Sequence, residues 1–142
     1  MTDGGIYYSG HGEEFKKFNT KDGYGIVKLQ RSGVKVGIIT GRVSAIVRVR
    51  AKELGISDLY QNLDNKMEAY RKIKKKLEFA DAEVAYVGDD EPDIPVLKCV
   101  GFAAAPADAM PEVCSMVHYV CSRKGGDGAV REVIDLILDA QS

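Results

Sequence analysis

Four acidic side chains lie within five residues of one short stretch, Gly88-Asp89-Asp90-Glu91-Pro92-Asp93. Their carboxylates repel one another, and burial would add a desolvation cost to each. Such a stretch is stable in water, at the start of a helix that it caps, or around a hard cation that it binds through oxygen. Because it directly follows a buried-strand pattern at 84–87, we expect this acidic cluster to hold a magnesium ion. Capping of the next helix by Asp90 or Asp93 is the alternative.

A second polar motif, Thr40-Gly41-Arg42, also comes directly after an apolar run, at 34–39. A hydroxyl and free backbone N–H groups at the start of a helix form an anion site, and the same geometry would make Thr40 a plain N-cap. Lys66 opens a later helical stretch, although most lysines are simply solvated. In open α/β sheets ligands bind beyond the carboxyl ends of strands, so these two strand ends are the candidate site.

Alternating strand and helix patterns must position these residues. A hairpin is expected over 6–18, with a turn at Ser9-Gly10-His11-Gly12. A helix from Asp22 should end at Gly33, and Gly55 should lie just past the end of another. Further strands are expected at 34–39, 58–61, 84–87, 102–105 and 119–120, and further helices at 44–54, 66–77, 94–100, 111–116 and 128–138. This alternation predicts an α/β fold with a parallel sheet covered on both faces.

Length and composition indicate one domain spanning residues 1–142. Apolar residues make up 45% of the chain, which argues against disorder, and the net charge of −1 without charged blocks gives no surface for nucleic acid or anionic lipid. No apolar run has the roughly 18 residues that span a bilayer. Three cysteines without CxxC spacing suggest buried thiols in a reduced, cytoplasmic protein.

The order of these motifs along the chain resembles the pattern of the haloacid-dehalogenase superfamily of phosphatases. That order is a Thr-Gly at a strand end, then a helical Lys, then a Gly-Asp-Asp at a second strand end. The chain is most similar to the small cap-less 3-deoxy-D-manno-octulosonate 8-phosphate phosphatases, which implies a three-layer Rossmann-like parallel sheet with an N-terminal hairpin. The segments that carry this resemblance are Asp3-Gly-Gly-Ile-Tyr-Tyr, Phe18-Asn19-Thr20-Lys21-Asp22-Gly23, Ile39-Thr40-Gly41-Arg42, Gly88-Asp89-Asp90-Glu91-Pro92-Asp93 and Ser122-Arg123-Lys124-Gly125-Gly126-Asp127-Gly128-Ala129.

The resemblance implies a role for each matched position. Thr40 would hydrogen-bond the transferring phosphoryl group, with Gly41 and Arg42 beside it in contact with substrate, and Lys66 would neutralise the phosphoryl oxygens. Asp89 would bind Mg2+, while Asp90 and Asp93 would hold bound water or neighbouring groups. The hairpin of residues 5–19 would build a homotetramer, in which Arg123 and Lys124 reach a neighbour's site. The substrate would be 3-deoxy-D-manno-octulosonate 8-phosphate or a related sugar acid phosphate of lipopolysaccharide precursor synthesis.

One part of the family pattern is absent from this sequence. The family's first strand ends in Asp-x-Asp-Gly, which supplies the nucleophile and the general acid/base just before the segment found here as Thr2-Asp3-Gly4-Gly5. Asp3 lies after the expected pair and is not its equivalent. We therefore expect a sequence truncated before this motif, without the central first strand of the sheet, and inactive as it stands.

Two other classes of protein fit part of the pattern. A non-catalytic oligomerisation module, similar to the carboxyl-terminal domain of animal acylneuraminate cytidylyltransferases, would explain the absent nucleophile but not the retained Thr40, Lys66 and Asp89. A phospho-receiver domain also uses Asp, Thr and Lys on an α/β sheet. Its acidic pair precedes the Thr and Lys, whereas here the acids follow them.

Overall fold

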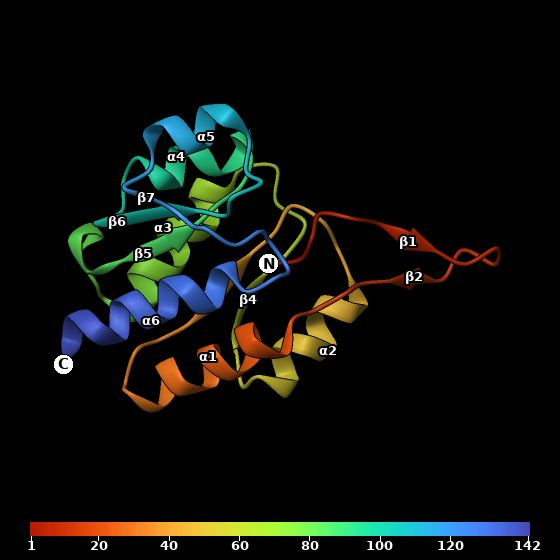
Figure 1. The fold of residues 1–142 in the computed structure, drawn as a ribbon, viewed down its shortest axis with the longest axis horizontal. Helices are drawn as coiled ribbons and strands as arrows, with labels where there is room; N and C mark the ends of the chain where they lie inside the picture. The colour runs from red at the N-terminus through yellow and green to blue at the C-terminus, as the bar shows by residue number, and fades with distance from the viewer.

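The N-terminal hairpin projects from the body of the molecule. The computed structural model describes residues 1–142, and the hairpin consists of β1 (Tyr7–Tyr8) and β2 (Glu14–Phe15), which pair antiparallel. Figure 1 shows both strands extending away from the other elements. The prediction of a hairpin around the Ser9–Gly12 turn is confirmed.

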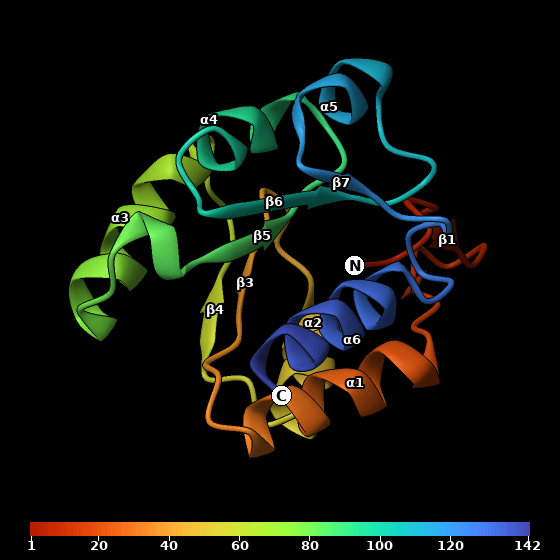
Figure 2. The same ribbon diagram turned by 60° about the vertical axis from the view of Figure 1, so that its left-hand side comes forward.

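The remaining strands form two parallel sheets. The first pairs β3 (Gly37–Ile39) with β4 (Asp58–Tyr60), and the second has the order β5 (Ala85–Val87), β6 (Phe102–Ala105), β7 (Tyr119–Val120). No strand pairs with the edge of β3 that faces away from β4, or with the edge of β5 that faces away from β6. These strands therefore form two separate sheets, β3-β4 and β5-β6-β7, where the sequence pattern predicted one (Figure 2).

Helices cover both faces of the β5-β6-β7 sheet, as expected. On one face lie α3 (Lys66–Leu77), α4 (Ile94–Leu97) and α5 (Pro111–Met116), and on the other lies α6 (Ala129–Gln141). The chain also forms α1 (Thr20–Arg31), which packs against α6, and α2 (Ala45–Glu53), with 3-10 turns at Asp81–Glu83 and Glu91–Asp93. No helix is both long and apolar enough to cross a membrane.

The core is arranged around β6, whose successive side chains point to opposite faces of the sheet. Ala103 and Ala105 point to one face, where they pack in a cluster with α3, α4 and α5. Ala104 points to the opposite face and packs against Ala129 and Val133 of α6. Successive side chains of a strand alternate between faces, so small residues in β6 let helices approach closely from both sides.

Helix boundaries agree with the sequence patterns to within about three residues: α4 ends at Leu97 instead of 100, and α6 continues to Gln141 instead of ending at 138. The predicted bounds of α3 and α5 are confirmed, and Gly55, with a φ of +68°, lies just past α2. The N-cap of α2 is Ser44, whose side chain accepts a hydrogen bond from Val47 N, so the alternative reading of Thr40 as this helix's cap is wrong. The first helix begins at Thr20, before Asp22, because the Asn19 side chain caps it.

Candidate functional site

A buried ion pair joins the carboxyl ends of the two sheets. Lys66, the first residue of α3, places its Nζ 2.6 Å from Oδ1 of Asp93, which follows β5. Tyr86 donates its hydroxyl to the same oxygen at 2.6 Å, and the backbone N–H groups of Asp89 and Asp90 donate to Oδ2 at 3.2 and 3.4 Å. Asp93 is only 2% exposed. Its charge is tolerated because a cation and several donors surround it.

The three aspartates of this loop have three different environments. Asp93 uses both oxygens on protein donors, and Asp90 accepts from Glu91 N at 2.8 Å, so helix capping explains part of the acidic stretch. Asp89 is held only through its backbone: its N–H donates to Asp93 and its carbonyl accepts from Met110 N at 2.9 Å. Its carboxylate has no protein partner and retains an exposed surface.

Electrostatics distinguish Asp89 further. Partial burial and then the nearby Asp93 charge raise the pKa of its carboxyl, while Lys66 opposes the shift. A carboxylate without hydrogen-bond partners beside other acids suits a hard cation, which prefers oxygen ligands. The residues present therefore fit one ligand position for Mg2+, although no group of three or more His, Cys, Asp or Glu side chains converges on a common point.

Thr40 lies at the same edge of the fold. Its N–H donates to Tyr60 O at 2.9 Å, which extends the pairing of β3 with β4, and its hydroxyl accepts from Arg42 N at 3.3 Å. Since β3 and β4 are parallel, Thr40 and the segment leading to Lys66 leave the sheet at the same end. The structure links Lys66 directly to the Asp89 loop, whereas no hydrogen bond connects Thr40 to either.

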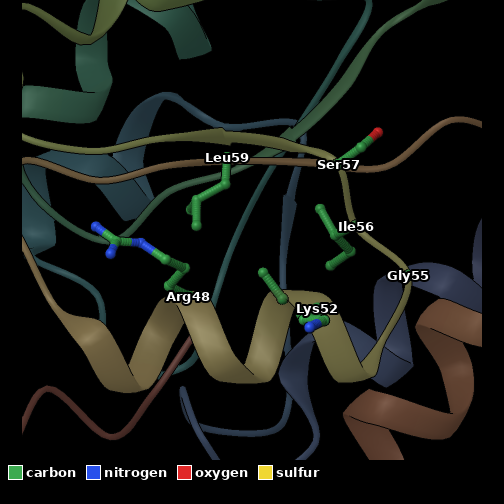
Figure 3. Close-up of a pocket in the computed structure, with 7 residues that line it drawn as sticks. Arg48, Lys52, Gly55, Ile56, Ser57 and Leu59 are labelled. Carbon is green, nitrogen blue, oxygen red and sulfur yellow. The ribbon is translucent and has the colours of Figure 1, made fainter.

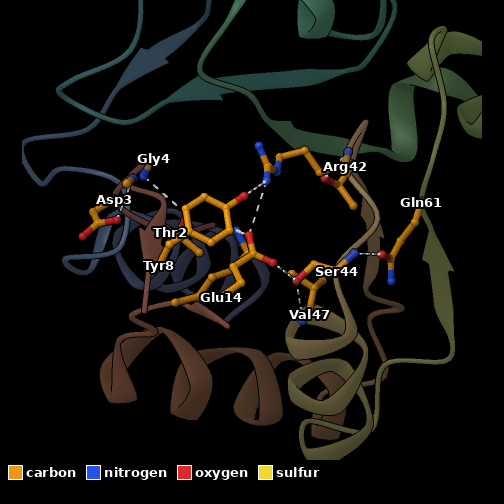
Figure 4. A network of polar contacts seen from close by, with 12 residues as sticks. Thr2, Asp3, Gly4, Tyr8, Glu14, Arg42, Ser44, Val47 and Gln61 are labelled. Atoms are coloured by element: carbon orange, nitrogen blue, oxygen red, sulfur yellow. Dashed lines mark hydrogen bonds and ion pairs between the residues drawn. The ribbon is translucent and has the colours of Figure 1, made fainter. Parts of the chain in front are cut away.

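Arg42 is joined to the hairpin by a polar network (Figure 4). Its guanidinium donates to Tyr8 Oη at 3.3 Å and lies 3.4 Å from Glu14 Oε1. Lys16 at 3.1 Å, and to a lesser degree Arg42, hold the pKa of Glu14 below its usual value. Ser44 Oγ is 3.5 Å from the same carboxylate. Sequence reasoning missed this contact of Glu14 with the loop after β3, because Arg42 and Ser44 are 28 and 30 residues away in the chain.

Arg123 and Lys124 lie on the loop between β7 and α6. Both are exposed, and their side chains form no ion pair within the chain. Gly126 has a φ of +70°, and a Cβ there would lie 2.5 Å from Asp3 N. The loop therefore packs against the N-terminal segment of its own chain, and only a glycine fits at this contact.

A separate surface groove of about 520 Å³ lies between α2 and the start of β4 (Figure 3). Its lining residues are Arg48, Ala51, Lys52, Gly55, Ile56, Ser57 and Leu59. The segment Gly55–Ser57 precedes β4, so the groove is near the amino end of that strand. It contains none of the candidate site residues.

Comparisons with known proteins agree with this geometry. Residues 26–101 match the family of haloacid dehalogenase-like hydrolases. Over 141 residues the chain is 50% identical to the 3-deoxy-D-manno-octulosonate 8-phosphate phosphatase KdsC of Yersinia pestis and 48% identical to that of Escherichia coli K12, covering 99% of this chain and 75% of each relative.

Solved structures of such phosphatases have the same fold. The crystal structure of the Yersinia pestis phosphatase superimposes with a TM-score of 0.98, covering 99% of this chain and 76% of that one. The phosphatase of Moraxella catarrhalis, in complex with magnesium ion, phosphate ion and KDO, gives 0.95 at 42% identity, with coverage of 98% and 80%. The chain therefore belongs to the haloacid dehalogenase-like hydrolases, in the subfamily of 3-deoxy-D-manno-octulosonate 8-phosphate phosphatases.

Proposed function

We propose that this protein is a magnesium-dependent phosphatase that hydrolyses 3-deoxy-D-manno-octulosonate 8-phosphate, or a related sugar acid phosphate, to the sugar acid and phosphate in lipopolysaccharide precursor synthesis. The observation that carries the proposal is the Lys66–Asp93 pair, which holds a cation beside the unpartnered carboxylate of Asp89 at the carboxyl end of the sheets. The relatives named above act on this sugar acid phosphate, which supports the same substrate here.

Each residue of the site has a role in this proposal. Thr40 donates its hydroxyl to the phosphoryl group, and Lys66 neutralises charge on its oxygens as the bond to the sugar breaks. Asp89 is a ligand of Mg2+, with Asp90 and Asp93 shaping the loop around it. The bound ion would supply Lewis-acid stabilisation of the phosphoryl oxygens. Gly41 and Arg42 lie beside Thr40 and contact the substrate.

We further propose that these 142 residues have no activity by themselves. No Asp-x-Asp pair occurs anywhere in them, and Asp3 is engaged elsewhere. Its Oδ2 accepts from Tyr7 Oη at 2.7 Å and its Oδ1 from Gly5 N at 2.9 Å, which lowers the pKa of this carboxyl and ties it to the base of the hairpin. Without a nucleophile and a general acid/base, the covalent route to phosphate release is closed.

Phosphate release tests this proposal directly. The 142-residue chain and a form extended at its N-terminus by a family Asp-x-Asp strand are compared with the sugar acid phosphate and Mg2+. We expect turnover only from the extended form, and its loss with a chelator. A turnover of about 1 s⁻¹ or more from the 142-residue chain would show that another residue is the nucleophile, because acid/base catalysis alone contributes roughly 10²–10⁴-fold. An extended form that cleaves aryl phosphates but not sugar acid phosphates would overturn the substrate assignment.

Assembly is the second part of the proposal: a homotetramer held by the hairpin, in which Arg123 and Lys124 complete a neighbour's site. Tyr8 and Phe15 on the hairpin are 61% and 54% exposed, and Tyr7 is 48% exposed. An isolated two-stranded hairpin is marginal in water, and its edges favour pairing. Sedimentation equilibrium of the extended form should give four copies, and a monomer at micromolar concentration would refute this assembly.

The alternative is a non-catalytic module that serves only for assembly. The exposed aromatic residues of the hairpin favour it, together with the absence of an Asp-x-Asp pair. A native N-terminal peptide identified by mass spectrometry separates the two functions. A peptide containing Asp-x-Asp supports the phosphatase, whereas a native start at Met1 supports the module.

A further inference from the structure

The loop that carries Arg123 and Lys124 is clamped at its beginning by a carboxylate of α6. Glu132 accepts four hydrogen bonds: Oε1 from Tyr119 Oη at 2.7 Å and Ser122 N at 2.8 Å, and Oε2 from Ser122 Oγ at 2.9 Å and Arg123 N at 3.1 Å. These bonds use both oxygens of one side chain. They fix the backbone as it leaves β7.

A second carboxylate clamps the same loop two residues later. Asp108, in the segment after β6, accepts a hydrogen bond from Gly125 N at 2.8 Å. Its neighbour Ala107 donates its N–H to Arg123 O at 2.9 Å. The backbone from Ser122 to Gly125 is thus held from two sides by groups that are 10 and 17 residues away in the chain.

The segment 107–110 also contacts the metal-site candidate. Met110 N donates to the carbonyl of Asp89 at 2.9 Å. One short segment therefore bonds to the Asp89 loop at one end and to the Arg123–Gly125 loop at the other. It therefore connects the Asp89 loop to the loop that carries the two cations.

The charged groups on this clamped backbone are unpaired, although the stem of Arg123 lies over Gly128. Arg123 and Lys124 are exposed, and neither is paired with an acid of the chain, although Asp108, Asp127 and Glu132 are close in sequence or in space. Asp108 and Glu132 bind backbone N–H groups instead of the cations. A fixed backbone with unpaired cations lowers the entropy lost when an anion binds, and Arg offers a planar fork that matches a carboxylate.

We infer that Asp108 and Glu132 are positioning residues, which hold Arg123 and Lys124 in a fixed geometry so that these cations select a substrate by its carboxylate. This inference rests on the proposed function, in which the two cations contact the sugar acid. Both carboxylates bind only groups of the segment 119–125, and the proposed site gives neither of them a role at the phosphoryl group. Their loss should weaken recognition of the sugar acid and leave the chemical step intact.

The test uses the extended, magnesium-loaded form and a set of matched variants. Asp108→Ala removes the acceptor of Gly125 N, Asp108→Asn keeps an acceptor oxygen, and Asp127→Ala removes a neighbouring acid whose side chain makes no hydrogen bond. Glu132→Gln is the parallel variant at the other clamp. Amide hydrogen exchange at Gly125 and Arg123 reports the clamps directly, and KM is measured for the sugar acid phosphate and for an aryl phosphate.

We expect Asp108→Ala to speed exchange at Gly125 about tenfold and to raise KM for the sugar acid phosphate by a similar factor, the ratio that corresponds to one lost hydrogen bond. The turnover number and KM for the aryl phosphate should stay unchanged. Asp108→Asn should keep exchange at Gly125 and KM for the sugar acid phosphate close to the values of the parent protein, and Asp127→Ala should change neither. Equal losses with both substrates, or no change in exchange, would overturn the inference.

Arg123→Ala separates this inference from the proposed function. If Arg123→Ala leaves KM for both substrates unchanged, the proposed role of Arg123 is wrong. If Arg123→Ala raises KM only for the sugar acid phosphate and Asp108→Ala does not, the cation binds substrate and the positioning role alone is refuted.

Discussion

Lys66 Nζ lies 2.6 Å from Asp93 Oδ1, and this contact joins the helix after β4 to the loop after β5 across two sheets that share no strand pairing. Asp93 is almost fully buried, and Lys66 keeps 16% of its side chain exposed. The pair therefore both tethers the two halves of the fold and holds a cation beside the free carboxylate of Asp89.

Removing either partner of this pair should lower the free energy of unfolding, and the two substitutions should differ in size. Asp93→Ala leaves Lys66 without its partner and frees Tyr86 Oη and two backbone donors, so we expect a loss of about 3–5 kcal/mol in the free energy of unfolding. Lys66→Met should cost less, because the other donors to Asp93 remain. Urea denaturation measures both. The exposed pair Glu68–Lys72, at 2.7 Å, provides the control, since Glu68→Ala should leave the urea midpoint nearly unchanged. Equal effects at both pairs would contradict this account.

Gly126 should tolerate no side chain. Its φ of +70° disfavours other residues, and a Cβ would also meet Asp3 N at 2.5 Å and the carbonyl carbon of Thr2 at 2.7 Å. We expect Gly126→Ala to lower the free energy of unfolding by at least about 1–2 kcal/mol, the strain of a left-handed conformation alone. Gly10→Ala is the matched control, because nothing lies within 4 Å of a Cβ there. A neutral Gly126→Ala, measured by thermal denaturation, would show that the N-terminal segment does not pack on this loop.

Glu132 should make the loop sensitive to acid. Burial alone would raise the pKa of Glu132, but hydrogen bonds from Ser122, Tyr119 and Arg123 outweigh it and lower the pKa from its ordinary value of 4.5. Because the folded-state pKa is the lower one, this stabilisation is present above about pH 4.5 and is lost as pH falls through the folded-state pKa. Urea midpoints between about pH 6 and pH 3 should fall more steeply in the parent protein than in Glu132→Gln. Identical slopes would rule out this contribution.

The three thiols should react with alkylating agents in a fixed order. Burial, and then the charge of Glu132, raises the pKa of the Cys121 thiol to about 11, whereas Cys99 is exposed and Cys114 is half-buried. The thiolate is the reactive form, so at about pH 8 iodoacetamide should label Cys99 first and Cys121 only after denaturation. Peptide mass spectrometry reads the order. Early labelling of Cys121 in the native protein would mean that β7 opens readily.

Much of the fold is determined by local patterns in the sequence. The period of apolar residues and the capping Asn65 define α3, and the alternation of apolar runs with helical stretches predicts parallel strands. The same order of Thr40, Lys66 and Asp89 along the chain indicates a phosphate-handling family. These features can be read from the sequence because secondary structure depends mainly on neighbouring residues, and the order of the motifs is simply their order along the chain.

Only the tertiary structure decided which side chains of these motifs remain free. By residue type Asp89, Asp90 and Asp93 are equivalent acids, and in the sequence only the family resemblance distinguishes Asp89 from the other two. In the structure Asp93 accepts hydrogen bonds from Lys66 and Tyr86, Asp90 caps a turn, and the carboxylate of Asp89 has no protein partner. Glu14 contacts Arg42 across 28 residues, and Asp108 contacts Gly125 across 17. The division of the sheet into two parts also depends on which strands are neighbours in space. Such pairings depend on how whole elements pack, and no local pattern of residues specifies them.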